Sequence, residues 1–153
     1  MRNAFIQNKV KNYESSPLEG GVCNSGFKYI VDSGGTFTAA IIANDVMKVC
    51  KARMIVIANS NKYGSGIIIN PKGAMNDGKF ELVILKNLDL IVLVKIISGN
   101  MPLNSEDVEI ISTHKATITT NIPVCFQIDG EYSGEKTELN ITILPKQIKV
   151  AIP

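Results

Sequence analysis

The stretch "VCFQIDGEYSGEKTELNITI", residues 124–143, decides the fold. Apolar and polar residues alternate along 124–128 and again along 139–143, with the period of two that is typical of β-strands. Between these runs stand the dipeptide Asp129-Gly130, which favours a tight hairpin turn, and a second turn signal, Ser133-Gly134. The same alternation returns at 147–152. The pattern predicts half-buried antiparallel strands joined by short turns, with one face in the core and the other in water.

Upstream, three short apolar runs predict further strands. "RMIVIAN" (53–59) and "FELVIL" (80–85) are typical of buried strands, and "SGIIIN" (65–70) lies between them after a polar, glycine-containing loop. Residues 88–98 combine the β-branched content of a strand with helix start and stop signals, and we expect a short, largely buried helix there. The fold class is therefore mainly β, a β-sandwich with one or two short helices.

The first fifty residues are less regular. Pro17 and several glycines separate short apolar pieces such as "FKYIV" and "TFTAAIIA". We expect residues 1–50 to form a poorly defined lead-in with short strands, and residues 51–153 to form the β-sandwich domain.

Composition excludes several classes of protein. The chain has 153 residues, 45% of them hydrophobic and 20% charged, which suits one globular domain with a real core. A net charge of +2 with scattered lysines argues against a nucleic-acid partner, and no segment has the length and apolar character of a membrane span or a secretory signal. Three cysteines without metal-ligand spacing predict reduced thiols and a cytoplasmic location.

Two motifs that suggest chemistry do not carry it. "SGGTFT" (33–38) has neither the lysine nor the spacing of a phosphate-binding loop, so a flexible turn is favoured. His114 has no serine or cysteine placed beside it as a nucleophile, which favours a surface or sheet-edge position.

Two acidic turns remain as candidate sites. Asn76, Asp77 and Glu81 place side-chain oxygens around Gly78, as a hard cation such as Mg²⁺ requires, although the same residues also suit a turn whose side chains cap backbone amides. Asp129 and Glu131 lie on the predicted hairpin at a sheet end, where rigid strands can direct them at a metal or at a hydroxyl proton.

Taken in order, these pieces resemble the C-terminal half of the diacylglycerol-kinase-type lipid kinases, a family that includes sphingosine kinases and shares its fold with NAD kinases. The matching elements cover roughly the last hundred residues. They are the Ala58-Asn59 strand end, the Tyr63-Gly64 loop with Gly66, Pro71 before the Asp77-Gly78 turn, the Asp129-Gly130-Glu131 motif and the closing "LPKQIKVAIP".

The resemblance implies roles for individual residues. Asp129 and Glu131 would face the active-site cleft as base or metal-orienting groups, and Asn76, Asp77 and Glu81 match an acidic turn where some members hold a structural Mg²⁺. Asn59, Tyr63 and Gly64 would bind substrate along the cleft wall. The family's nucleotide loop, Gly-Gly-Asp-Gly-Thr, is not in this sequence, so ATP would be bound mainly by an N-terminal nucleotide-binding domain that this chain lacks.

Two functions from different classes follow. The first is the substrate-side domain of an ATP- and Mg²⁺-dependent lipid kinase that phosphorylates a diacylglycerol- or sphingoid-like lipid at a membrane surface, inactive as an isolated chain. The alternative is a non-catalytic β-sandwich binding or regulatory module that retains the fold. A homodimer is a further candidate assembly.

Overall fold

The computed structural model describes residues 4–7, 35–60, 62–63, 67–68, 73–74, 77–87, 95, 104–128 and 131–144, with the backbone alone for 4–7, 62–63 and 67–68. The described residues are almost entirely strand. The strands are β1 (Ala4–Gln7), β2 (Phe37–Ala43), β3 (Val46–Ala52), β4 (Met54–Ala58), β5 (Lys62–Tyr63), β6 (Ile67–Ile68), β7 (Phe80–Leu85), β8 (Val108–Thr113), β9 (Lys115–Ile128) and β10 (Glu131–Thr142).

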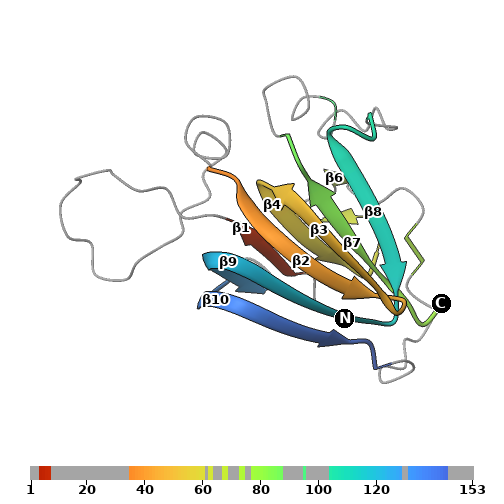
Figure 1. Cartoon of the computed structure of the whole chain (residues 1–153). Coiled ribbons are helices and arrows are strands. Elements are labelled where there is room, and N and C mark those ends of the chain that lie inside the picture. Colours follow the sequence, from red (N-terminus) through yellow and green to blue (C-terminus); the bar gives the residue numbers. More distant parts are fainter. Residues whose placement is uncertain are drawn as a thin grey trace.

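The strands form two antiparallel sheets. The larger sheet has the order β3-β2-β9-β1-β4-β7-β8, with β10 paired to the other side of β9, and β5 pairs with β6 in a sheet of two strands. Figure 1 shows the larger sheet curling, with β9 and β10 (blue) below β2, and β8 (turquoise) on the right. The predicted mainly-β, sandwich-type fold is confirmed.

The expected strands at 53–59 and 80–85 are confirmed as β4 and β7. The predicted helix at 88–98 lies outside the described residues apart from Lys95, which is helical and exposed. No helix within the described part of the chain is long and apolar enough to cross a membrane.

Residues 37–52 form a regular hairpin inside the main sheet. β2 and β3 pair along their whole length, from Phe37 with Ala52 to Ala43 with Val46. The two residues that connect them, Asn44 and Asp45, have φ values of 52° and 62°, the left-handed geometry of a type I′ turn. Residues 1–50 were expected to be a poorly defined lead-in, but residues 37–50 of that segment belong to this hairpin of the main sheet.

β9 is the longest strand and connects two halves of the sheet. On one side it pairs first with β2, through residues 116–120, and then with β1, through residues 125–128. Pro123 falls between these two ladders, where its lack of an N–H group breaks no pair with either strand. The β9–β10 register also shifts here, between Lys136 and Glu138.

Gly134 lies inside β10 and not in a turn. The register shifts by one residue between Tyr132 and Glu135, and Gly134 has a φ of 85°. This is the geometry of a β-bulge with glycine in the left-handed region. The prediction of a second turn at Ser133-Gly134 is therefore wrong, because turns and bulges both require the positive φ that glycine supplies.

We call the face of the curled sheet that carries its largest buried side chains the inner face. The core lies on this face. These side chains include Phe37, Ile41, Ile55, Leu82, Ile84 and Ile118. The opposite face is also buried over β4 and β7.

The second face is likewise buried near the end of β9, where Cys125 and Gln127 are 0% and 3% exposed. The expectation that this face of 124–128 meets water is therefore wrong for Cys125 and Gln127. Cys125 is disulfide-bonded, so the prediction of reduced thiols is wrong for this residue, whereas Cys50 is free.

Candidate functional site

The predicted hairpin at Asp129-Gly130 is confirmed by the strands on either side of it. β9 ends at Ile128, β10 begins at Glu131, and these two residues are cross-strand partners. The connection is therefore two residues long. Asp129 and Gly130 themselves lie outside the described residues, so the role predicted for Asp129 stays a prediction.

The hairpin decides which face Glu131 occupies. If β9 had run on, Glu131 would share the face of Gln127, but as the partner of Ile128 it shares the inner face with Ile128, because cross-strand partners project to the same side. Glu131 is exposed, and so lies at the open rim of the inner face. Tyr132, the partner of Gln127, is 44% exposed on the other face.

The strand register brings Asn59 to the same end of the sheet. Ile57, Ala4 and Ile128 lie in one row across β4, β1 and β9, and that row continues to Glu131 on β10. Asn59 directly follows the end of β4 and is buried, at 6% exposed. β4 lies two strand spacings, about 10 Å, from β9.

Glu81 lies at this end of the sheet as well, but on the opposite face from Glu131, because it alternates with the core residues Phe80 and Leu82. It pairs with Ala58 of β4 on one side and with Ser112 of β8 on the other. Its carboxylate is buried, at 6% exposed, and its Oε1 accepts a hydrogen bond of 3.1 Å from the Ser112 hydroxyl. We call the set Asn59, Glu81, Ser112 and Glu131 the Glu131 end of the sheet.

Asp77 lies in a local turn. Its Oδ1 accepts a 2.9 Å hydrogen bond from the backbone N–H of Lys79, and Gly78 between them has a φ of 73°. This is the amide-capping arrangement that the sequence offered as the alternative to a metal site.

The described residues include no group of three or more His, Cys, Asp and Glu side chains placed to hold a metal ion. The metal-binding role expected for Asn76, Asp77 and Glu81 stays a prediction, since an asparagine with two carboxylates is not such a group. Asn76, Gly64 and the side chain of Tyr63 are outside the described part of the structure, and their roles stay predictions. His114 is exposed, and its backbone carbonyl accepts from the N–H of Ile143.

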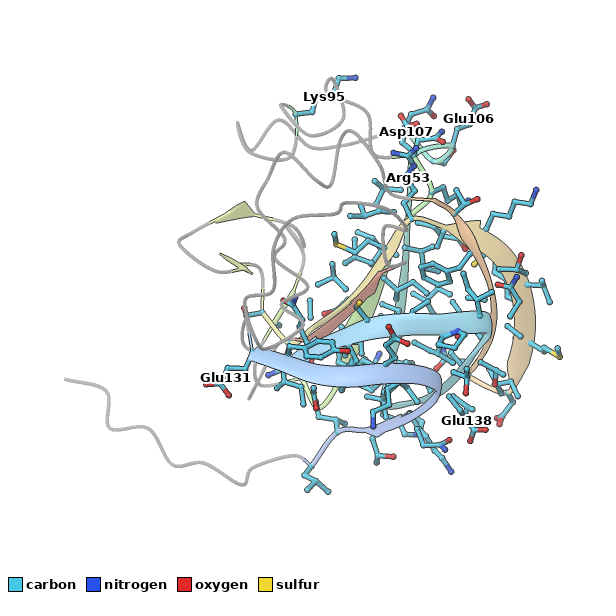
Figure 2. All side chains as sticks on the ribbon, turned by 90° about the vertical axis from the view of Figure 1, so that its left-hand side faces the viewer. Arg53, Lys95, Glu106, Asp107, Glu131 and Glu138 are labelled. Atoms are coloured by element: carbon cyan, nitrogen blue, oxygen red, sulfur yellow. The ribbon has the colours of Figure 1, made fainter. Side chains whose placement is uncertain are left out.

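Charged residues also gather away from the Glu131 end. Figure 2 shows Glu131 at one end of β10 and Glu138 further along it, while Arg53, Glu106 and Asp107 lie together elsewhere on the molecule. Arg53 precedes β4 and donates its backbone N–H to Leu85, which places it at the opposite end of β4 from Asn59. The rim around Glu131 is therefore distinct from this mixed-charge cluster.

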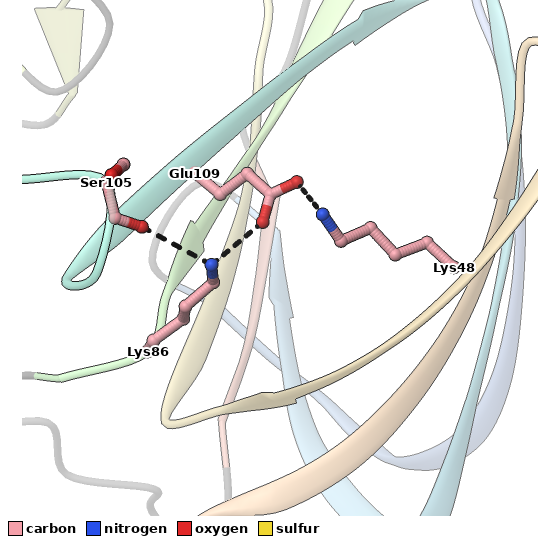
Figure 3. Close-up of polar contacts among 4 residues, drawn as sticks. All are labelled: Lys48, Lys86, Ser105 and Glu109. Atoms are coloured by element: carbon pink, nitrogen blue, oxygen red, sulfur yellow. Dashed lines mark hydrogen bonds and ion pairs between the residues drawn. The ribbon is translucent and has the colours of Figure 1, made fainter.

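A second polar cluster joins two of the edge strands of the sheet, β3 and β8. Lys48 of β3 and Lys86, which follows β7, both donate to the carboxylate of Glu109 on β8, and Lys86 also reaches the carbonyl of Ser105 (Figure 3). The Lys86–Glu109 distance is 2.9 Å. We call the line where β3 faces β8 the seam.

The seam changes the acidity of two groups. Burial alone would raise the pKa of Glu109, but the hydrogen bonds from Lys48 and Lys86 lower it below the ordinary value for glutamate. Burial raises the pKa of the Cys50 thiol, and the nearby Glu109 carboxylate adds to this effect while the two lysines oppose it. Cys50 is therefore a neutral thiol at neutral pH.

The seam also contacts the Glu131 end. Asn44, at the tip of the β2–β3 hairpin, donates from Nδ2 to the backbone carbonyl of Ser112 at 2.9 Å. Because the Ser112 hydroxyl donates to Glu81, a short polar chain runs from the hairpin tip to a buried carboxylate. Ser112 and Glu109 were not predicted as site residues, because pairing between distant strands has no local signal in the sequence.

Comparison with known proteins gives a consistent result. Residues 35–152 match the family model described as the YegS C-terminal NAD kinase beta sandwich-like domain. No curated protein sequence matches the chain significantly.

Solved structures show the same fold. A candidate diacylglycerol kinase from Bacillus anthracis str. Sterne matches with a TM-score of 0.64 and 20% identity, over 78% of this chain and 42% of that one. Two further structures of diacylglycerol kinases from the same organism match with TM-scores of 0.63 and 0.61, at 21% and 18% identity. The first of these matches includes 77% of this chain and 41% of the other chain, and the second includes 72% and 40%. The chain thus spans about two fifths of each of these structures.

Proposed function

The chain belongs to the family of YegS C-terminal NAD kinase β-sandwich-like domains, and from this membership we propose that it is the substrate-side domain of an ATP-dependent lipid kinase. The acceptor would be the hydroxyl of a diacylglycerol- or sphingoid-like lipid. The similar structures, which are described as diacylglycerol kinases and are more than twice as long as the matched region, support a partnership with a separate nucleotide-binding domain.

One observation carries the proposal: the strand register places Asn59 and Glu131 at one end of the sheet. Glu131 is exposed at the first position of a strand, so its carboxylate is available to a bound molecule while its backbone is held by the ladder. A carboxylate in this position can accept the proton of an attacking hydroxyl.

The remaining parts of the site would come from elsewhere. Phosphoryl transfer depends mainly on positioning and on charge stabilisation around the phosphates. In the proposal, the nucleotide-binding domain holds ATP with Mg²⁺, the Glu131 end orients the lipid hydroxyl, and Asp129 acts beside Glu131. The complete enzyme would work in the cytoplasm, peripherally at a membrane surface.

The test combines this chain with a nucleotide-binding domain produced separately from a relative such as the Bacillus anthracis protein. Transfer of the γ-phosphate from radiolabelled ATP to diacylglycerol in mixed micelles is measured. We expect phosphorylation with both domains and none with either alone. Glu131→Ala and Asp129→Ala should each reduce the rate by about 100-fold or more, the usual contribution of a general base.

Glu138→Ala is the matched control, because Glu138 is an exposed carboxylate on the same strand, far from the hairpin, and it should leave the rate unchanged. If the combined domains form a complex that binds ATP but transfers no phosphate, the kinase proposal fails and the non-catalytic binding module is favoured. Full activity in both hairpin variants would overturn the roles given to Asp129 and Glu131.

A further inference from the structure

An apolar patch is exposed on the outer face of the β2–β3 hairpin. Ile42, Met47 and Val49 are 48%, 65% and 61% exposed. The register places Ile42 beside Met47 and Ala40 beside Val49, so these four side chains form two adjacent rows on one face. We call Ala40, Ile42, Met47 and Val49 the β2–β3 patch. Large exposed apolar side chains that stand next to one another on one face are typical of an interaction surface.

A partner would approach the patch from its face and not from the edge of β3. Edge strands are commonly protected from pairing with another chain by inward-pointing charges. Lys48 has this position, because it lies between Met47 and Val49 in the alternation and reaches across the seam to Glu109. The hairpin tip is also tied to β8 by the Asn44–Ser112 hydrogen bond.

The patch is also far along β9 from Glu131 itself. Ile42 lies opposite Thr117 on β9, whereas Glu131 lies opposite Ile128. Ile128 is eleven positions after Thr117 on β9, which corresponds to roughly 35 Å along the strand. A nucleotide-binding domain that faces Glu131 would not cover the patch.

The charges at the two ends of the patch have opposite signs, so they would pair between two copies related by a two-fold rotation. Along β3, exposed Asp45 precedes the patch and exposed Lys51 follows it, with Met47 and Val49 between them. Consider a second copy laid face to face on the first, with the two β3 strands antiparallel and stacked over each other. The two-fold axis then lies between the sheets, perpendicular to β3, at the level of Lys48. In this arrangement each Asp45 meets the Lys51 of the other copy. Met47 then meets Val49, which is the reciprocal pairing that a two-fold interface requires.

Side-chain size follows the same symmetry. Ile42 stands in the row of Met47, and Ala40 in the row of Val49. The rotation exchanges these rows, so the large Ile42 of one copy lies over the small Ala40 of the other. Apolar contact, size and charge thus agree on one arrangement.

We propose that the β2–β3 patch binds a second copy of this chain in a face-to-face, two-fold dimer. An anionic membrane is the main rival, but the patch is flanked by charges of both signs, whereas a membrane-binding surface is enriched in lysine and arginine. The dimer does not depend on the proposed kinase function, and its test uses no catalytic readout.

The test measures the mass of the 153-residue chain by sedimentation equilibrium across a range of concentrations. The wild-type chain should form a reversible dimer. Met47→Asp should raise the dissociation constant by at least tenfold, because it places a charge in the apolar contact. Leu144→Asp is the matched control: Leu144 is 63% exposed but lies outside the patch, so the dissociation constant should stay within twofold, roughly the scatter for surface substitutions.

Charge exchange tests the geometry. Asp45→Lys and Lys51→Asp should each weaken the dimer by roughly tenfold, since each brings like charges together twice in the two-fold interface. The double variant should restore the wild-type affinity. Because Asp45 has a positive φ, Asp45→Asn provides a second variant that the turn tolerates, and circular dichroism confirms that each variant is folded.

Three results would overturn the proposal. The first is a wild-type chain that stays monomeric at its highest soluble concentration. The second is a dimer that Met47→Asp leaves intact. The third is a monomeric chain that binds vesicles of anionic phospholipid and loses that binding with Met47→Asp, which would assign the patch to a membrane.

Discussion

Gly134 shows how one residue sets the shape of the hairpin that carries Glu131. Its φ of 85° lies in the left-handed region, and the bulge at this position shifts the pairing of β10 by one residue. A β-carbon added to Gly134 would meet no atom within 4 Å. The cost of replacing this glycine is therefore the conformational strain of the backbone alone.

Gly134→Ala should lower the free energy of unfolding by about 1 kcal/mol, the typical cost of holding an L-residue in the left-handed region. Gly134→Asn should cost less, because asparagine tolerates this conformation. Urea denaturation of the three chains gives the values. Ser133→Ala, on the exposed neighbouring residue, serves as a control expected within about 0.5 kcal/mol of wild type, and an alanine variant at position 134 as stable as wild type would refute the strained bulge.

At the scale of elements, sequence patterns predicted the strands that have strong apolar runs or regular alternation. β4 and β7 are wholly or almost wholly buried, and the hairpin of β9 and β10 carries the Asp-Gly signal. β2 and β3 were not predicted as long strands. Their turn is Asn44-Asp45 and not the more usual Asn-Gly, and β3 is an edge strand whose exposed side chains are valine and methionine, which hides the alternation.

The alternation in β2 predicts opposite effects for two neighbouring isoleucines. Ile41 is 1% exposed in the core, whereas Ile42 is 48% exposed. Ile41→Ala should destabilise the chain by about 3 kcal/mol through lost burial and a cavity, and Ile42→Ala by less than about 1 kcal/mol. Thermal and urea denaturation at low chain concentration check both values; equal losses would mean that β2 does not present its residues to two different faces.

The Glu131 end shows what local patterns leave out. Asn59 and Glu131 were each singled out from neighbouring residues, yet their common position at one end of the sheet depends on β1 pairing with both β4 and β9. That pairing joins segments more than a hundred residues apart in sequence. Ser112 was not predicted because its hydrogen bond to Glu81 depends on the pairing of β7 with β8.

At the scale of the whole molecule, side chains connect the two edges of the curled sheet. β3 and β8 are the terminal strands in the sheet order, and no described backbone ladder joins them. The Lys48–Glu109 ion pair and the hydrogen bond from Asn44 to the carbonyl of Ser112 cross this seam, and Lys86 binds the same carboxylate from the end of β7. The curled shape thus depends in part on ionised side chains.

Glu109→Gln should destabilise the chain by about 1 kcal/mol at neutral pH, as expected for a partly exposed ion pair with two partners. Because the pKa of Glu109 is lowered in the folded state, its contribution is present above the ordinary glutamate pKa and is lost as the pH falls through the folded value. Denaturation at a series of pH values should therefore show the wild-type and variant stabilities converging in acid.

Glu106→Gln is the control for that experiment, since Glu106 is exposed in the turn that precedes β8. It should leave stability and its pH dependence unchanged. A constant difference between wild type and Glu109→Gln at every pH would show that the ion pairs do not contribute.

The position of β1 has a consequence for how the chain folds. Its four residues are flanked by β4 and β9, whose pairing segments begin about 50 and 120 residues later in the sequence. β1 cannot complete both ladders until those strands exist, so closing this slot is a late, high-contact-order step that slows folding. Until then the neighbouring edges of β4 and β9 remain open, and the nascent domain presents a vacant strand site to chaperones and to the β1 segments of other copies.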